Sequence, residues 1–318
     1  MERPILSARG AAGYLEALDN VLLLTHVRPD GDTIGSAAAL CRALQDCGQT
    51  AYLLPNPEIT ATYAPYAAPY WAPEDWQAEH IVSVDIADAS LLPENAQSYR
   101  DRIELAIDHH PSQTFFARNT CLEADSAACG EIVYEIIQHL TALTADIALP
   151  LYVAVSTDCG GFQYGNTTAR THRIAAALMD VVDVAAVNKT LFRTKSRVRL
   201  AMESRMVADM KLFDHQRVVV MEIPLSLRQE MQATDADIEE LSALPALVEG
   251  TDFGVTLREL RPGTVKVSVR TGPRVDACAL CRILGGGGHH AASGATVEGT
   301  LDEARMAVLA AYRKVIGA

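Results

Sequence analysis

Short apolar runs alternate with longer stretches of helical spacing over the first 180 residues or so of the chain. Runs of a few β-branched and leucine residues, bounded by polar or turn-forming residues, are typical of buried strands. They occur at 21–25, 50–54, 81–85 and 105–108, and helical spacing occurs at 11–18, 32–47, 129–143 and 172–179. Strands that alternate with helices predict an α/β fold with a mainly parallel sheet flanked by helices.

The rest of the chain has a different pattern. The stretch 189–210 has helical spacing without Pro or Gly and is basic at its start, which indicates a helical linker. Beyond it, 217–222, 254–259 and 264–270 alternate like half-buried strands, and 301–316 reads as a terminal helix. Because 318 residues suit two domains, we predict a first domain at 1–187, a linker at 188–212 and a smaller α/β domain at 213–318.

Polar residues follow the apolar runs of the first domain. His26, Asp30 and Asp32 come after the first run, Asp85 and Asp108 end two others, and Asp158 follows the apolar run 150–156. In open parallel sheets, ligands bind at the carboxyl ends of the strands. Four runs that deliver acidic or histidine residues to one edge therefore predict a functional site there.

The densest group is His26, Asp30 and Asp32. Imidazole and carboxylate ligands suit Mn²⁺, Fe²⁺ or Zn²⁺, and a divalent cation relieves the repulsion between two close carboxylates. An alternative is equally open from these residues alone: Asp30 forms the turn and Asp32 caps the following helix.

A second group, Asp108, His109 and His110, ends another apolar run and favours a ligand role, whereas Asp85 or Asp158 taken singly is also consistent with a cap. Together the candidates can hold two cations about 3.5–4 Å apart, with a bridging carboxylate and a bridging water as nucleophile, as in two-metal phosphoester hydrolysis. The full set is His26, Asp30, Asp32, Asp85, Asp108, His109, His110 and Asp158.

A third motif is glycine-rich. Gly286, Gly287 and Gly288 follow Gly285 and precede His289, with Ser293 close by. Consecutive glycines let backbone N–H groups approach an anion, and the motif lacks the Lys-Ser/Thr of a P-loop. A tight turn is the alternative. Arg270 is a candidate partner because guanidinium groups bind phosphate bidentately.

Composition narrows the function. The formal charge of −13 disfavours binding along long duplex nucleic acid. No apolar stretch is long enough to span a membrane, and seven scattered cysteines fit reduced thiols in the cytoplasm. The pair Cys278 and Cys281 favours a core-facing helix over a metal or redox site.

These motifs, in this order along nearly the whole chain, resemble the DHH superfamily of phosphoesterases and its NrnA-like oligoribonuclease and pAp-phosphatase group. The matching segments are His26-x-x-x-Asp30-x-Asp32, Asp85, Asp108-His109-His110, Asp158-Cys-Gly and the glycine block. One departure is Cys159, where the family usually has Thr. A thiol there would alter metal preference or sensitivity to oxidation.

The resemblance implies a DHH domain with two Mn²⁺ ions and a DHH-associated domain that closes over the cleft. It implies that His26 and Asp30 hold one ion, that Asp32, His109 and Asp158 hold the other, and that Asp85 bridges them. Asp108 would orient the site, and His110 would face the substrate phosphate. Arg270, His289 and Ser293, with the glycines, would bind the terminal phosphate or nucleotide.

The activity implied by the resemblance is hydrolysis of short oligoribonucleotides to mononucleotides and of 3′-phosphoadenosine 5′-phosphate (pAp) to AMP. One alternative is a phosphodiesterase for cyclic-di-AMP or linear dinucleotides on the same scaffold. Another is a non-catalytic nucleotide sensor, which an intact ligand set disfavours. The sequence leaves a homodimer open.

Overall fold

The chain folds as two compact units, Met1–Thr194 and Lys195–Ala318. The computed structural model describes residues 4–272, 274–288 and 290–317. The division between the units falls inside the segment 188–212, and the domain limits expected from the sequence stay a prediction. Each unit has its own sheet and its own cores, so each is described separately.

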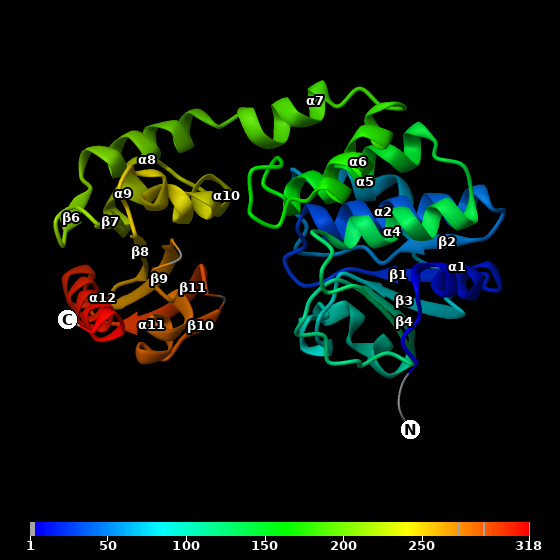
Figure 1. Cartoon of the computed structure of the whole chain (residues 1–318), viewed down its shortest axis with the longest axis horizontal. Coiled ribbons are helices and arrows are strands. Elements are labelled where there is room, and N and C mark those ends of the chain that lie inside the picture. The colour runs from blue at the N-terminus through cyan, green and yellow to red at the C-terminus, as the bar shows by residue number, and fades with distance from the viewer. Residues whose placement is uncertain (1–3, 273, 289, 318) are drawn as a thin grey trace. The chain divides into compact units, whose positions relative to one another are not determined.

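The described residues of the first unit form a five-stranded parallel sheet with the order β2-β1-β3-β4-β5 (Figure 1). The strands are β1 (Val21–Leu24), β2 (Ala51–Leu53), β3 (His80–Val84), β4 (Ile103–Asp108) and β5 (Asn119–Leu122). The predicted α/β fold with a parallel sheet is confirmed. The edge strand β5 escaped prediction because its four residues include only two apolar ones, Cys121 and Leu122.

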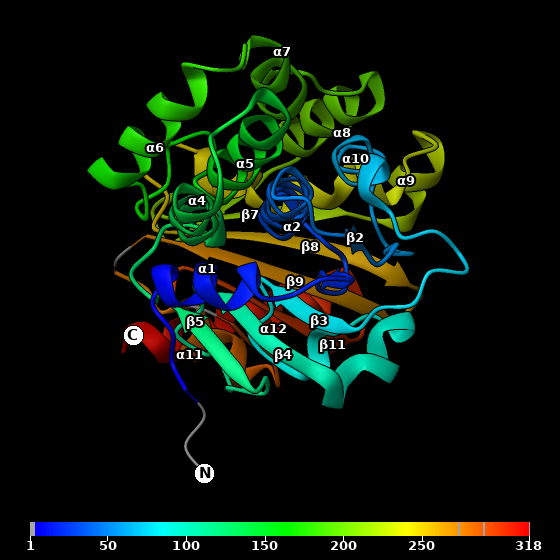
Figure 2. The same ribbon diagram turned by 90° about the vertical axis from the view of Figure 1, so that its right-hand side faces the viewer.

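Helices cover one face of this sheet, as Figures 1 and 2 show for α2, α4 and α5. The α-helices of the unit are α1 (Ala8–Glu16), α2 (Gly31–Asp46), α3 (Ala64–Ala67), α4 (Cys129–Leu140), α5 (Ala145–Asp158), α6 (Ala169–Met179) and α7 (Ala185–Asn188). Short 3₁₀ helices lie at Ala68–Tyr70, Ala89–Leu91 and Glu94–Arg102, and a π-helix lies at Lys189–Arg193.

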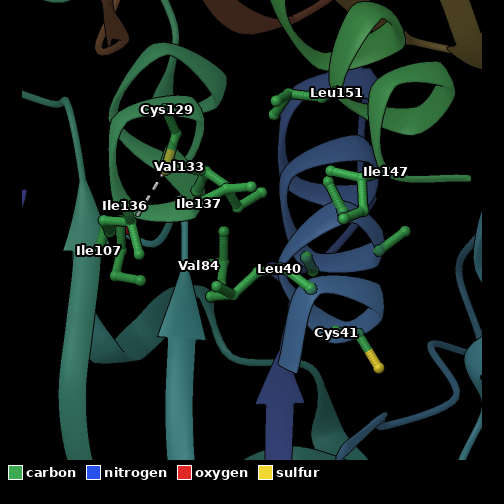
Figure 3. Close-up of a cluster of buried hydrophobic side chains, with 14 of the residues drawn as sticks. Leu40, Cys41, Val84, Ile107, Cys129, Val133, Ile136, Ile137, Ile147 and Leu151 are labelled. Carbon is green, nitrogen blue, oxygen red and sulfur yellow. Dashed lines mark hydrogen bonds between the residues drawn. The ribbon is translucent and has the colours of Figure 1, made fainter. Parts of the chain in front are cut away.

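Alternate residues of the central strands β1, β3 and β4 serve two cores, because successive side chains point to opposite faces of a sheet. Leu23 of β1 and Val84 of β3 belong to the core beneath the helices, whereas Leu22 belongs to the core under the 3₁₀ segments. Figure 3 shows the first core, where Leu40 of α2 and Val133 of α4 meet Val84. Burial on both faces explains why these strands read as continuous apolar runs.

The run before Asp158 is a helix, which corrects the expectation that all four polar ends follow strands. Helix α5 spans Ala145–Asp158 and is buried around most of its circumference. A helix that is apolar all round lacks the amphipathic period by which a sequence reveals a helix. Asp158 therefore comes to the site from the last residue of α5.

Glycines bring α5 close to its neighbours. A Cβ added at Gly31 would lie 2.2 Å from Thr157 Oγ1, and one at Gly35 would lie 2.2 Å from the Pro150 carbonyl oxygen. A Cβ at Gly130 of α4 would lie 2.9 Å from the Ala154 Cβ. These contacts leave no room for a side chain, so the glycines set how near Asp158 comes to α2 and α4.

The described residues of the second unit form a six-stranded sheet with the order β10-β11-β9-β8-β7-β6, antiparallel except between β7 and β8. Its strands are β6 (Lys211–Phe213), β7 (Val218–Ile223), β8 (Phe253–Arg261), β9 (Thr264–Thr271), β10 (Gly287–Gly288) and β11 (Ala292–Glu298). Its helices are α8 (Arg197–Ala208), α9 (Leu225–Glu230), α10 (Asp235–Ile238), the 3₁₀ helix Glu239–Leu247, α11 (Ala277–Ile283) and α12 (Leu301–Ile316).

Two sequence interpretations need adjustment here. The stretch 189–210 is not one helix, because the π-helix ends at Arg193 and α8 begins at Arg197 after an extended Thr194. On α11, Cys281 lies in the core as predicted, but Cys278 is partly exposed, and both thiols are free. Among the described residues, no helix has both the length and the apolar character needed to cross a membrane.

The contact between α2 and α5 generates a stability prediction. Gly35→Ala would place a Cβ 2.2 Å from one backbone atom of α5 and 2.7 Å from another, the nitrogen of Ala154. Because backbone must move, we expect a loss of about 1–3 kcal/mol in the free energy of unfolding, measured by urea denaturation. Gly13→Ala in α1 is the matched control, since no heavy atom lies within 4 Å of its added Cβ. It should gain about 0.5–1 kcal/mol. Equal stability of the two variants would contradict this account of the packing.

Candidate functional site

The first two aspartates are held by the N-termini of two helices. Asp30 caps α2, since its Oδ1 accepts hydrogen bonds from the N–H groups of Asp32 at 3.1 Å and Thr33 at 3.2 Å. The alternative interpretation, in which Asp32 caps this helix, is therefore wrong, because the cap of α2 is Asp30. Asp32 instead accepts hydrogen bonds from the N–H groups of Cys129 at 2.6 Å and Gly130 at 2.9 Å, which begin α4. Helix N-termini favour negative charge, so both carboxylates are stabilised in fixed positions.

Asp85 is the most constrained residue of the cluster. It follows β3 directly, has a φ of 61°, and is only 3% exposed. A left-handed backbone is unusual for a residue with a side chain and stores strain. Among the described residues, nothing donates a hydrogen bond to its buried Oδ1. A buried carboxylate oxygen without a donor is costly, so this position calls for a positive group.

A backbone carbonyl fixes the tautomer of His109. Its Nδ1 lies 3.0 Å from the carbonyl oxygen of Ser126. Because a carbonyl only accepts, Nδ1 carries a proton, and in the neutral ring Nε2 then presents a lone pair. That Nε2 lies 3.8 Å from Asp32 Oδ2, 3.5 Å from Asp85 Oδ1 and 3.8 Å from Asp158 Oδ2. These separations exceed hydrogen-bond length and suit ligands around a shared cation.

His26 is oriented in the same way on the other side of Asp85. Its Nδ1–H donates to the carbonyl oxygen of Val27 at 2.8 Å. Its Nε2 then lies 3.6 Å from Asp30 Oδ1 and 3.7 Å from Asp85 Oδ2. Both oxygens of Asp85 thus face a histidine nitrogen.

Asp108 faces its neighbours rather than the cluster. It is fully buried at the end of β4, and its Oδ1 accepts hydrogen bonds from the His109 N–H at 2.9 Å and from His110 Nδ1 at 2.8 Å. Its Oδ2 accepts from Gln113 Nε2 at 2.7 Å. The hydrogen bond to Asp108 raises the pKa of His110. Asp108 therefore orients His110, whose other ring nitrogen is left for a further partner.

Three groups of ligand atoms lie close together among the described residues. Within each group the atoms lie within 4.8 Å of one another. The groups are His26 with Asp30 and Asp85, Asp32 with His109 and Asp158, and Asp85 with His109 and His110. All the metal-ligand candidates predicted from the sequence are therefore brought together. Asp85 belongs to the first group, and its Oδ1 lies 3.5 Å from His109 Nε2 of the second. Mixed imidazole and carboxylate donors fit divalent Mn, Fe or Zn.

The electrostatics also call for cations. Burial, and then the charge of Asp32, raises the pKa of Asp85 well above its ordinary value. Burial, and then the charge of Asp158, does the same to the pKa of Asp32. Carboxylates crowded in this way ionise together at neutral pH only when positive charge lies between them.

Cys159 lies beside Asp158. Its side chain is fully buried, and burial raises the pKa of the thiol to about 12. Burial thus disfavours the thiolate, which is the form that binds metals and reacts with oxidants. The expected effect of this departure from the family pattern stays a prediction.

The glycine motif of the second unit joins the other substrate-binding candidates on one sheet. Arg270 of β9 is paired with Ala292 of β11, and Gly288 of β10 is paired with Ser293. A Cβ at Gly286 would lie 2.1 Å from the Gly294 carbonyl oxygen, and one at Gly288 would lie 2.8 Å from the Ala292 carbonyl oxygen. Gly286 and Gly288 must therefore be glycine because β11 lies too close for a side chain at either position. The sequence analysis missed this reason. His289 lies outside the described residues.

Sequence reasoning also missed residues that position the candidates. Ser126 and Val27 act through their backbone carbonyls, Gln113 holds Asp108, and Asn166 donates to the carbonyl oxygen of Asp158 at 3.2 Å. A backbone carbonyl is present at every residue, so the sequence carries no signal for this use of it. Gln113 and Asn166 are polar residues in loops, where such residues are common.

Comparison with known proteins agrees with this geometry. The DHH family, N-terminal domain, matches residues 20–155. The bifunctional oligoribonuclease and PAP phosphatase NrnA of Thermus thermophilus is 32% identical over 313 residues, which cover 96% of this chain and 93% of that protein.

Two solved structures share the fold. An exopolyphosphatase-related protein from Bacteroides fragilis has a TM-score of 0.88 at 22% identity and covers 98% of this chain and 96% of its own. Exonuclease RecJ bound to manganese has a TM-score of 0.50 at 12% identity and covers 98% of this chain and 95% of its own. The resemblance read from the motifs is confirmed: the chain belongs to the DHH family, within the group that includes the bifunctional oligoribonuclease and PAP phosphatase NrnA.

Proposed function

We propose that the protein is a phosphoester hydrolase that converts short oligoribonucleotides to mononucleotides and pAp to AMP with two divalent cations. The observation that carries this proposal concerns buried Asp85. It belongs to the first group of metal-ligand candidates and lies 3.5 Å from His109 of the second, and one of its oxygens has no donor among the described residues. The name of the Thermus relative supports the choice of substrates.

The residues that would hold the cations fall into the two groups. His26 and Asp30 would hold one, Asp32, His109 and Asp158 the other, and Asp85 both. When bound, such cations supply positive charge for the reacting phosphate and activate water for attack on phosphorus. Mn²⁺ is our choice because the donors suit it and because a solved RecJ structure of the same fold is bound to manganese.

His110 is assigned to the substrate phosphate. Its Nδ1–H is held by Asp108, and in the protonated ring both nitrogens donate hydrogen bonds. Its side chain is about a third exposed, whereas Asp108 is fully buried. His110 can therefore reach a ligand without leaving its hydrogen bond.

The second unit is assigned to the end of the substrate. Arg270, Ser293 and Gly286–Gly288, together with His289, would bind the terminal phosphate or nucleotide. A net charge of −13 suits a substrate that needs only a few cationic contacts. No observation favours cyclic dinucleotides, and an intact ligand set argues against a pure sensor. The seven free thiols fit a reducing compartment, so we propose a cytoplasmic location.

The metal centre predicts opposite effects of one substitution. Without divalent cations, Asp85→Asn should be more stable than the wild type by about 1–3 kcal/mol, because it removes a buried carboxylate that has one oxygen without a donor. With Mn²⁺ at about 100 times its Kd, the wild type should gain about 2.7 kcal/mol per site, and the variant should gain much less. Thermal unfolding with and without Mn²⁺ measures both effects. An equal gain in the two proteins would remove Asp85 from the ligands.

The substrate assignment predicts different kinetic defects in the two units. With Mn²⁺, purified protein should release mononucleotides from a 5′-phosphorylated diribonucleotide and AMP from pAp, and a chelator should stop both reactions. Asp85→Ala should lower kcat by at least about 10³-fold. Arg270→Ala should mainly raise KM, by about 10-fold or more for the loss of a charged hydrogen bond.

Lys266→Ala is the matched control for Arg270→Ala, because Lys266 is an exposed cation four residues earlier on β9. It should leave KM unchanged. Absence of product from both substrates, with Mn²⁺ shown to be bound, would refute the proposed activity.

A further inference from the structure

The segment 123–130, which runs from the end of β5 into the first turn of α4, contacts two ligand candidates of the second group directly and the third through Asn166. The Ser126 carbonyl oxygen holds His109 Nδ1, and the N–H groups of Cys129 and Gly130 hold Asp32. The third contact passes through Asn166, whose Nδ2 donates to the Ala127 carbonyl oxygen at 2.9 Å and to the Asp158 carbonyl oxygen at 3.2 Å.

Arg170 of α6 holds this segment from outside the cluster. Its Nη1 donates to Glu123 Oε2 at 2.9 Å and to Ser126 Oγ at 3.1 Å. The same two residues form the ends of a turn, because the Ser126 N–H donates to the Glu123 carbonyl oxygen. Arg170 therefore links both ends of this turn. Its Nη2 also pairs with Glu135 Oε1 at 2.6 Å. A planar guanidinium can hold several acceptors at once in a fixed geometry.

A buried carboxylate extends the contact into α4. Glu131 is 1% exposed, and its Oε1 accepts a hydrogen bond from Thr171 Oγ1 at 2.5 Å. Its Oε2 accepts from the Ala127 N–H at 3.4 Å and lies 3.8 Å from Arg170 Nε. Arg170 thus supplies the positive charge that this buried carboxylate requires.

The first group has separate supports. His26 is held by the Val27 carbonyl oxygen, and Asp30 is held by the N–H groups of Asp32 and Thr33. None of these supports lies in the segment 123–130. A change in the conformation of that segment would therefore displace His109 directly, whereas it would affect His26 only indirectly.

We infer that Arg170 is a positioning residue for one cation of the pair, which it serves by fixing the segment 123–130 so that His109 and Asp32 point to the same place. The inference rests on the proposed function, because it concerns the cation held by Asp32, His109 and Asp158. Groups that orient metal ligands typically change metal affinity by about 10–100-fold when they are removed.

The test is a titration of the whole protein with Mn²⁺, followed by electron paramagnetic resonance of the free ion. We expect two equivalents to bind to the wild type. Arg170→Met should weaken one of them by about 10–100-fold and leave the other within about twofold. Arg173→Met is the matched control, because Arg173 is exposed on the same helix, and it should bind as the wild type does. Arg170→Lys keeps the charge but loses the planar guanidinium that holds several acceptors. Its affinity for the weakened Mn²⁺ equivalent should lie between those of the wild type and Arg170→Met.

Glu123→Gln provides a second variant if Arg170→Met fails to fold, since Glu123 is about a third exposed. It should weaken the same equivalent. Unchanged binding in a folded Arg170 or Glu123 variant would overturn the inference, and so would equal weakening of both equivalents, which a merely structural role produces. Failure of the wild type to bind Mn²⁺ would instead overturn the metal centre of the proposed function, and the inference with it.

Discussion

The negative charge at the carboxyl edge of the parallel sheet is the constraint on which the rest of the first unit depends. Asp85 is buried in a left-handed backbone conformation, and its Oδ1 has no donor among the described residues. This oxygen faces His109 Nε2, and Asp32 and Asp158 add further carboxylates around that nitrogen. A protein of ordinary stability tolerates such crowded carboxylates only where a ligand of opposite charge offsets their repulsion.

The surrounding fold fixes these groups without neutralising them. Helix N-termini hold Asp30 and Asp32, and backbone carbonyls hold the two histidine rings with Nε2 free. The aspartates are held by backbone atoms of α2 and α4, and the histidines by the backbone carbonyls of Val27 and Ser126 in the connections that follow β1 and β5. The shape of the cluster is therefore held by contacts within the protein, and preorganisation of this kind is what metal-assisted hydrolysis requires.

Close helix packing supplies the remaining ligand candidate. Gly31 and Gly35 of α2 and Gly130 of α4 let α5 approach so closely that a Cβ at any of them would collide with it. The last residue of α5 is Asp158, which reaches His109 because of this approach. These three glycines, none of which is itself a ligand candidate, thus determine whether the second group has two carboxylates or one.

The sequence by itself determined the parallel sheet, the order of its polar ends and the ligand types, because buried strands and chemically costly residues leave local signals. His26, Asp85 and Asp108 were found in this way, as was their family resemblance. Only the tertiary structure decided that Asp158 comes from a helix, that Asp32 caps α4 rather than α2, and that Asp108 faces His110. Those outcomes depend on which elements pack together and on backbone atoms that every residue carries. Neither gives a signal in the amino-acid sequence.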